Sequence, residues 1–240
     1  MSVVTIDRQD ALNALNVETL TELRDRLREL ATDEDVRVVV LTGAGEKAFV
    51  AGADIKYMSG LGSGEAKSWG ALGHEAGRLL ETMAKPTIAA INGFALGGGC
   101  ELALACDLRY ASSLAKLGQP EINLGIVPGW GGTQRLARVC GLGVAKDLIF
   151  TGRTVAAEEA LRIGLVSAIA DPVLDKAVET AHELAAKSSL ALALAKRLVN
   201  MAPGALDAEA DEFGELFSSA DAIEGLTAFA EKRPPKFLGR

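Results

Sequence analysis

Histidine and cysteine are scarce in this sequence of 240 residues, which contains two histidines and three cysteines. His74 and His182 both fall in alanine- and leucine-rich helical patterns, so we interpret them as surface or packing residues rather than catalysts. Cys100, Cys106 and Cys140 have apolar or helix-like neighbours and no Cys-x-x-Cys spacing, which predicts small buried residues. We therefore expect no metal site, and carboxylates are the acid–base groups that remain.

The sequence also lacks an apolar run of membrane-spanning length and a basic leader followed by an apolar segment. We expect no membrane partner and a cytoplasmic protein, or one in the soluble lumen of an organelle if a presequence has been removed. Hydrophobic residues make up 49% of the chain, which allows an ample core in one large domain, or in one domain with an appendage.

Basic residues are fewer than acidic ones, which gives a formal net charge of −7. A nucleic-acid surface needs a basic face, so we expect no nucleic-acid partner. A small polyanion can still bind where a few cations lie close together, and the C-terminal Lys232, Arg233, Lys236 and Arg240 form such a cluster. The alternative is an ordinary solvated tail.

Nucleotide-binding motifs are absent or incomplete. There is no Gly-Lys-Ser/Thr triplet, which excludes a P-loop. Residues 42–48 (TGAGEKA) imitate a dinucleotide fingerprint, so an NAD-dependent dehydrogenase is a rival interpretation. That fingerprint needs a helix that starts inside the glycines and an acidic residue that closes the next strand, whereas residues 49–54 (FVAGAD) intervene with two further small-residue turns and no such strand. The motif is therefore only weak evidence for a dehydrogenase.

The most informative segment begins with a buried strand over residues 87–91, which enters a tight turn at Asn92-Gly93. Three glycines, Gly97 to Gly99, then precede a predicted helix over residues 101–106. Glycines at the start of a helix let a ligand approach the backbone, and free N–H groups there suit an anionic oxygen. Glu101 follows at once.

A second carboxylate, Glu121, lies between glycines and prolines and precedes the glycine-rich loop 128–133 (PGWGGT). If Glu101 and Glu121 converge on one cleft, they can act as a general acid and a general base. The alternative is that both glutamates cap helices or are solvated, as most glutamates are.

Several of these segments resemble the crotonase (enoyl-CoA hydratase/isomerase) superfamily, most strongly residues 85–101 (KPTIAAINGFALGGGCE). Other segments match the family's motifs in the same order along nearly the whole chain: residues 11–15 (ALNAL), 49–56 (FVAGADIK), 119–121 (QPE), 128–136 (PGWGGTQRL) and 230–233 (AEKR).

The resemblance implies an α/β fold, with a crotonase-like ββα spiral core over residues 1–185 and a helical C-terminal oligomerisation region over residues 186–240. Strand–turn blocks around Gly43, Gly93, Leu117 and Val166 fit such a recurring unit. In the family the C-terminal helices pack subunits into trimers and cover the active site, and pairs of trimers form hexamers. We therefore expect a homotrimer or a hexamer, with a helical break at Pro203-Gly204.

The resemblance also implies the roles of individual residues. The backbone N–H groups of Ala53 and Gly98 form an oxyanion hole for a thioester oxygen, Glu101 activates water, and Glu121 delivers or removes a proton at C2. The expected substrate-binding residues are Ala51, Asp54, Ile55, Lys56, Gly97, Gly129, Trp130 and Lys232. Coenzyme A is part of the substrate, so we expect no separate cofactor.

Three of these residues have open alternatives. Lys56 and Lys232 either contact the phosphates of coenzyme A, Lys232 from a neighbouring subunit, or are plain surface lysines. The Trp130 indole either packs beneath its loop or forms a wall of the acyl pocket that favours short substrates.

The function that the resemblance implies is enoyl-CoA hydratase, a hydro-lyase that adds water reversibly to trans-2-enoyl-CoA in fatty-acid β-oxidation or related acyl-CoA metabolism. Another activity of the superfamily is the alternative, namely Δ3-Δ2 enoyl-CoA isomerase or dehydration of a short hydroxyacyl-CoA. RNA binding is a remote alternative, which the acidic charge disfavours.

The local patterns also predict individual elements. A helix capped by Asn16 carries Leu20, Leu23, Leu27 and Leu30 on one face. Strands are predicted over residues 3–6, 36–41 and 165–169, and helices over residues 65–83, 133–139, 144–150 and 155–163, with an almost wholly helical chain from Val173.

Overall fold

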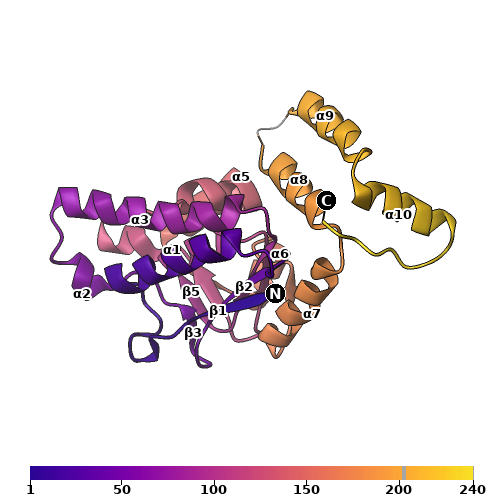
Figure 1. Cartoon of the computed structure of the whole chain (residues 1–240). Coiled ribbons are helices and arrows are strands. Elements are labelled where there is room, and N and C mark those ends of the chain that lie inside the picture. Colours follow the sequence, from indigo (N-terminus) through magenta and orange to yellow (C-terminus); the bar gives the residue numbers. More distant parts are fainter. Residues whose placement is uncertain (202–203, 240) are drawn as a thin grey trace.

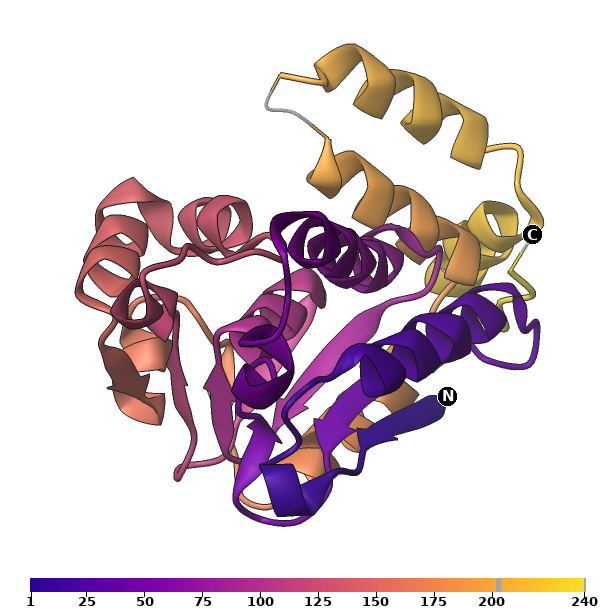
Figure 2. The same ribbon diagram turned by 90° about the vertical axis from the view of Figure 1, so that its left-hand side faces the viewer.

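The computed structural model describes residues 1–201 and 204–239 and contains two small β-sheets wrapped by helices (Figures 1 and 2). The first sheet is parallel and has the order β1-β2-β4-β6-β9. Its strands are β1 (Ser2–Ile6), β2 (Val39–Gly43), β4 (Thr87–Ile91), β6 (Leu108–Ala111) and β9 (Ala168–Ile169). Every residue of β2 and β4 is buried, which is why these segments lack the alternating pattern of a half-exposed strand.

The second sheet has the order β3-β5-β7-β8, with β7 and β8 antiparallel and the other pairs parallel. Its strands are β3 (Ala48–Val50), β5 (Phe94–Leu96), β7 (Lys116–Gly118) and β8 (Thr154–Ala156). The chain passes from one sheet to the other at each repeat, from β2 to β3, β4 to β5 and β6 to β7. This alternation confirms the predicted ββα fold.

Successive repeats stack closely at their turns. A Cβ atom on Gly93 would lie 2.2 Å from the Lys47 carbonyl oxygen, so a side chain there would separate the two turns. The Asn92 amide donates to the Gly45 oxygen at 2.7 Å and the Ala48 oxygen at 3.1 Å. The Asn-Gly pair thus ends β4 and also joins two repeats.

Helices cover both sheets, and after β9 the described chain contains helices without further strands. They are α1 (Val17–Thr32), α2 (Ile55–Met58), α3 (Ser63–Thr82), α4 (Gly98–Ala105), α5 (Gly132–Thr151), α6 (Ala157–Arg162), α7 (Val173–Ala185), α8 (Ser189–Asn200), α9 (Leu206–Leu216) and α10 (Ala220–Ala230), with the 3-10 helices η1 (Gln9–Ala11) and η2 (Pro120–Leu124). The α1 prediction is confirmed, because the Asn16 side chain accepts from the Thr19 N–H and the four named leucines are buried. The two helices predicted over residues 133–150 are the halves of α5, which kinks at Gly141.

Several predicted boundaries are wrong, among them that of the helix predicted over residues 101–106, which begins at Gly98 as α4. Residues 36–38 precede β2, and β9 covers only two residues of the predicted strand 165–169. The helix predicted over 155–163 begins at Ala157, because Thr154 to Ala156 pair with β7 as strand β8 and Val155 is buried in the core. Pro203, where we expected a helical break, lies outside the described residues, as does Arg240.

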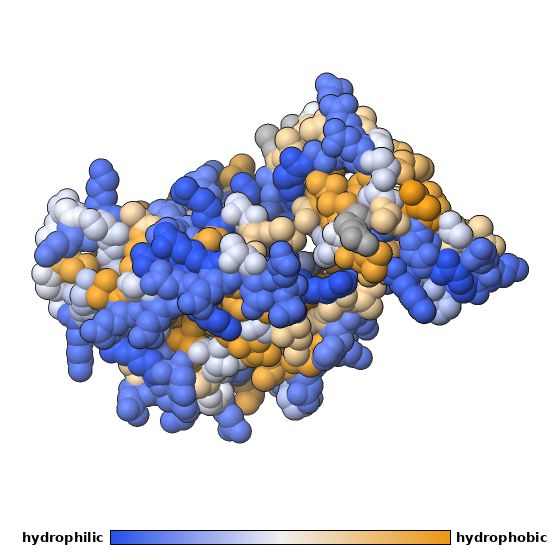
Figure 3. Space-filling model, viewed as in Figure 1, coloured by the Kyte–Doolittle hydropathy of each residue, from blue (hydrophilic) through white to orange (hydrophobic). Residues whose placement is uncertain are grey.

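The C-terminal helices differ in how they contact the sheets. Lys196 holds α8 to the body of the molecule, since its ammonium group lies 2.8 Å from the Asp107 carboxylate and donates to the carbonyl oxygens of Leu80 and Lys85. In Figures 1 and 2, α9 lies on the far side of α8 from the sheets. Apolar residues gather on these helices, at the upper right of Figure 3. No described helix is long and apolar enough to cross a membrane.

Candidate active site

A cavity of about 590 Å³ lies where the second sheet meets α2, α3, η2 and the start of α5. Most of the predicted site residues line it: Ala51, Ala53, Ile55, Gly97, Gly98, Glu101, Glu121, Gly129 and Trp130. Its other walls are mainly apolar and include Met58, Leu61, Ala66, Trp69, Leu124, Ile126 and Val127. Two carboxylates at the edge of an apolar cavity are typical of a small-molecule catalytic site.

Ala53 and Gly98, which line this cavity, were predicted to supply backbone N–H groups to the site. The segment that carries Ala53 is fixed by neighbouring bonds, since the Leu15 N–H donates to the Gly52 oxygen at 2.9 Å and the Asp54 N–H donates to the Leu15 oxygen at 2.8 Å. Gly98 is the first residue of α4, where helical N–H groups have no partner within the helix. In the described part of the chain, the N–H groups of Ala53 and Gly98 donate to no protein acceptor. They are therefore free to bind a ligand oxygen.

Glu101 lies in the first turn of α4 and is buried. Its Oε1 accepts the N–H groups of Trp130 at 2.7 Å and Gly132 at 2.8 Å. Burial raises the pKa of Glu101, and these two hydrogen bonds oppose that effect. The end of the loop between η2 and α5, together with the first residue of α5, thus holds one oxygen of the carboxylate, and Oε2 accepts no hydrogen bond from the described protein groups.

Glu121 lies on η2, directly after Pro120 at the first helical position. Burial raises the pKa of its carboxyl group to about 7, and the nearby charge of Glu101 adds to the increase. The Gln119 amide lies 3.2 Å from both Glu121 oxygens and, with its nitrogen toward them, donates to both. A Cβ atom on Gly97 would lie 2.6 Å from Glu121 Oε1, and Gly97 has a φ of 49°, so only glycine suits this position.

The Trp130 indole is both packed and part of the cavity wall. Only 4% of the residue is exposed, and its ring meets Trp69 edge to face with centroids 5.0 Å apart. Two glycines make room for it, because a Cβ on Gly73 or Gly98 would lie 2.2 or 2.3 Å from indole carbons. Packing and a position in the cavity lining therefore do not exclude each other, and the effect of the indole on substrate length stays a prediction.

Three predicted substrate-binding residues lie outside the cavity lining. The Asp54 side chain accepts the N–H groups of Lys56 and Tyr57 as the N-cap of α2, and its other oxygen pairs with Arg8 at 2.7 Å. Its role in the structure is therefore to fix the segment that carries Ala53. Lys56 is exposed on α2, and Lys232 follows α10 in the C-terminal region.

The remaining basic tail is partly neutralised. Arg233 lies 2.7 Å from carboxylate oxygens of Glu224 and Glu231. His74 and His182 are exposed, as expected. Cys100 and Cys106 are buried, whereas Cys140 is half-buried, so the prediction for the cysteines is wrong in part.

Two residues of the site were missed from the sequence, Gln119 and Trp69. Gln119 belongs to the 119–121 motif, and its contact with Glu121 needed the turn geometry of η2. Trp69 is buried on α3, and its contact with Trp130 joins residues far apart in the sequence.

The fold and the two carboxylates beside free N–H groups suit an enzyme whose substrate oxygen gains negative charge during the reaction. The family model described as enoyl-CoA hydratase/isomerase matches residues 1–240, and the chain belongs to this family.

Similar proteins include the short-chain-enoyl-CoA hydratase of Clostridium acetobutylicum, which is 50% identical over 97% of this chain and 92% of its own. The crotonyl-CoA hydratase of Syntrophomonas wolfei is 47% identical over 100% of this chain and 95% of its own. Among solved structures, the enoyl-CoA hydratase from Bacillus anthracis has a TM-score of 0.93 and 41% identity over 99% of this chain and 96% of its own.

Proposed function

We propose that this chain is an enoyl-CoA hydratase that adds water reversibly to the C2–C3 double bond of a trans-2-enoyl-CoA. The observation that carries the proposal is the meeting of Glu101 and Glu121 in one cavity with the N–H groups of Ala53 and Gly98. A carboxylate pair with an oxyanion site is the arrangement that hydration of a conjugated thioester requires.

In this mechanism the thioester oxygen accepts the N–H groups of Ala53 and Gly98. Glu101 Oε2 binds the water, takes one of its protons and directs the hydroxyl group to C3. The double-bond electrons move toward the thioester oxygen, where the two N–H dipoles stabilise the enolate more than the ground state. Glu121 then gives its proton to C2.

The environments of the two glutamates suit a reaction in which one of them donates a proton and the other accepts one. The substrate gains a hydroxyl group and a proton from one water molecule, and the pair carries one proton before and after the reaction. A pKa of about 7 leaves a large share of Glu121 protonated at neutral pH, while the two backbone bonds hold Glu101 ready to accept a proton. Gly129 lies beside the water in this proposal.

The acyl-CoA substrate determines the proposed roles of the other residues. Ala51, Ile55 and Gly97 line the path of the thioester, and Trp130 closes the acyl pocket. Lys56 and Lys232 contact coenzyme A phosphates, with Lys232 supplied by a neighbouring subunit, and Asp54 acts only through the backbone it fixes. The names of the relatives from C. acetobutylicum and S. wolfei support short substrates.

The assembly and its setting are part of the same proposal. Residues 1–185 form the catalytic core, and residues 186–240 pack subunits into a trimer or a hexamer in the cytoplasm. Exposed apolar side chains on the last two helices support an interface there: Phe213, Phe217, Ile223, Leu226 and Phe229.

The test is an absorbance assay of crotonyl-CoA hydration by wild type, Glu101→Gln and Glu121→Gln. We expect each variant to lose about 10²- to 10⁴-fold in turnover, because each removes one proton-transfer group. Glu29→Gln, on the exposed face of α1, is the matched control. An inactive wild type would refute the hydratase proposal, and an active Glu101→Gln or Glu121→Gln would refute the role of that residue.

A further inference from the structure

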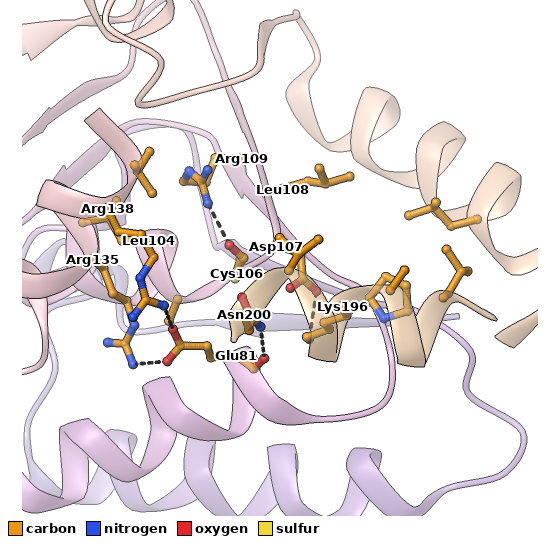
Figure 4. Close-up of a pocket in the computed structure, with 17 residues that line it drawn as sticks. Glu81, Leu104, Cys106, Asp107, Leu108, Arg109, Arg135, Arg138, Lys196 and Asn200 are labelled. Atoms are coloured by element: carbon orange, nitrogen blue, oxygen red, sulfur yellow. Dashed lines mark hydrogen bonds and ion pairs between the residues drawn. The ribbon is translucent and has the colours of Figure 1, made fainter. Parts of the chain in front are cut away.

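A second cavity, of about 350 Å³, lies between α8 and the ends of α3, α4 and α5 (Figure 4). Most of its charged groups are paired. Lys196 meets Asp107, and both Arg135 and Arg138 reach the carboxylate of Glu81. One of these residues, Arg135, also contacts the loop that holds Glu101.

Arg135 makes two contacts in different directions. Its Nη2 lies 2.9 Å from Glu81 Oε2, and its Nη1 donates to the Trp130 carbonyl oxygen at 2.8 Å. The side chain is 11% exposed, whereas that of Arg138 is 63% exposed. Arg138 bonds Glu81 at 3.2 Å from the next turn of the same helix, and no hydrogen bond joins it to the loop among the described residues.

The space around the Arg135 guanidinium is shaped by glycines. A Cβ on Gly131 would lie 2.3 Å from Nη1, and Gly131 has a φ of 109°, which other residues rarely adopt. A Cβ on Gly77 of α3 would lie 3.1 Å from the same atom. The guanidinium is thus enclosed between α3 and the loop in one orientation.

Trp130 connects this ion pair to the candidate active site. Arg135 holds the carbonyl group of Trp130, and the N–H of Trp130 holds Glu101 Oε1 together with the N–H of Gly132. The path from Glu81 to Glu101 therefore runs through one arginine and one peptide segment.

We propose that Arg135, anchored by Glu81, is a positioning residue that sets the orientation of Glu101 through the segment from Trp130 to Gly132. This inference rests on the proposed role of Glu101 as the group that binds water. Without the guanidinium, the Trp130 carbonyl group loses its donor, and the loop can move relative to α4. A displacement near 1 Å at a catalytic group can cost about 10²-fold in rate.

The kinetic test compares Arg135→Met, Arg135→Lys and Arg138→Met in crotonyl-CoA hydration. Arg138→Met is the matched control, because it removes an arginine from the same helix, the same cavity and the same carboxylate. We expect Arg135→Met to lose about 10- to 100-fold in kcat with KM changed less than about threefold, because its target is a catalytic group and not a binding group. Arg135→Lys should recover part of the loss, and Arg138→Met should stay within about threefold of wild type.

A pH profile provides a second readout that a purely structural role would not change. Three ionisable groups interact with Glu101: its charge adds to the raised pKa values of the Glu121 carboxyl group on η2 and of the Cys100 thiol on its own helix, and the Arg135 guanidinium on α5 acts on Glu101 itself. Of these, Arg135 lowers the pKa of Glu101. Arg135→Met should therefore move the acid limb of kcat/KM to higher pH, while Arg138→Met leaves it in place.

Each outcome is decisive. Equal kcat values for Arg135→Met and Arg138→Met, or a loss confined to KM, would refute the positioning role. If Arg135→Met does not fold, Arg135→Lys and Glu81→Gln take its place, and wild-type kcat in both would refute the proposal. Wild type and Glu101→Gln are measured alongside: an inactive wild type refutes the hydratase function itself, whereas an inactive Glu101→Gln beside a fully active Arg135→Met refutes only the positioning role.

Discussion

At the scale of single residues, the two glutamates differ in how their charge is stabilised. Glu101 is buried but accepts two backbone N–H groups, whereas Glu121 is held against Gly97 and contacts an amide group. Backbone donors favour the charged form of a carboxylate, and burial disfavours it. These environments suit a base at Glu101 and an acid at Glu121.

The raised pKa of Glu121 predicts a pH-dependent effect on stability that does not require activity. Its pKa is about 7 in the folded chain against an ordinary value of 4.5, so between these values the folded chain binds more protons than the unfolded chain. The contribution of Glu121 to wild-type stability therefore falls as pH rises from about 4.5 to about 7. In Glu121→Gln this loss is absent. The difference in the free energy of unfolding between the variant and wild type should therefore shift in favour of the variant by on the order of 2 kcal/mol between pH 4.5 and pH 8.

Urea unfolding at fixed protein concentration between pH 4.5 and pH 8 measures this difference. Glu29→Gln, whose carboxylate is exposed, is the control and should keep the wild-type pH dependence. If the free energies of unfolding of Glu121→Gln and wild type run parallel across this range, Glu121 does not carry a raised pKa.

At the scale of elements, α3 and the loop before α5 build one wall of the candidate site together. Gly73 leaves a notch in α3, and the Trp130 indole fills it against Trp69. A glycine inside a helix costs about 1 kcal/mol relative to alanine, and here the notch gives an aromatic side chain a defined place. Under the proposed function, the length of the acyl pocket thus depends on the packing of a helix against a loop.

This packing predicts a preference for short substrates. Wild type should prefer crotonyl-CoA to decenoyl-CoA in kcat/KM, and Trp130→Ala should raise the decenoyl to crotonyl ratio about tenfold or more, because each excluded methylene is worth about 1–3 kcal/mol. Trp130→Phe, with a smaller ring, should give an intermediate ratio. A wild type that prefers decenoyl-CoA, or an Ala variant with the wild-type ratio, would show that the indole does not limit chain length.

At the scale of the whole molecule, the C-terminal helices leave apolar side chains uncovered. Phe213 and Phe217 pack edge to face with centroids 5.0 Å apart, and Phe229 near the end of α10 is 87% exposed. Isolated exposed apolar residues are common, but a group of aromatic side chains on adjoining helices is typical of an interface. A second copy of the chain is the partner in our proposal.

The assembly predicts that Phe229→Asp lowers both the molar mass in solution and the turnover of crotonyl-CoA. A buried carboxylate at a subunit contact is unfavourable, and in the proposed assembly loss of the neighbouring tail also removes Lys232 from the coenzyme A site. Light scattering after size-exclusion chromatography measures the mass. Leu114→Asp is the control, because Leu114 is 78% exposed on the core between β6 and β7. A monomeric wild type, or an unchanged mass for Phe229→Asp, would contradict the proposed interface.

Local patterns in the sequence determined the elements that depend on near neighbours. Asn16 caps α1 because its side chain reaches an N–H three residues away, and the leucines that follow share one helical face. The apolar run of β4 and the glycines before Glu101 are also signals that depend only on neighbours in the sequence. The site residues Ala53, Gly98, Glu101 and Glu121 could be predicted from the sequence because the motifs that contain them are long and resemble those of a known family.

Tertiary structure decided what depends on distant partners. Thr154 to Ala156 form β8 because β7 is available to pair with them, although the same residues suit the start of a helix. The Arg135 contact with Glu81 and the burial that raises the pKa of Glu121 join residues from separate elements. Trp130 has its place because Gly73 leaves room on another helix. Side-chain environments are set by which surfaces pack together, and a pattern of near neighbours does not contain that information.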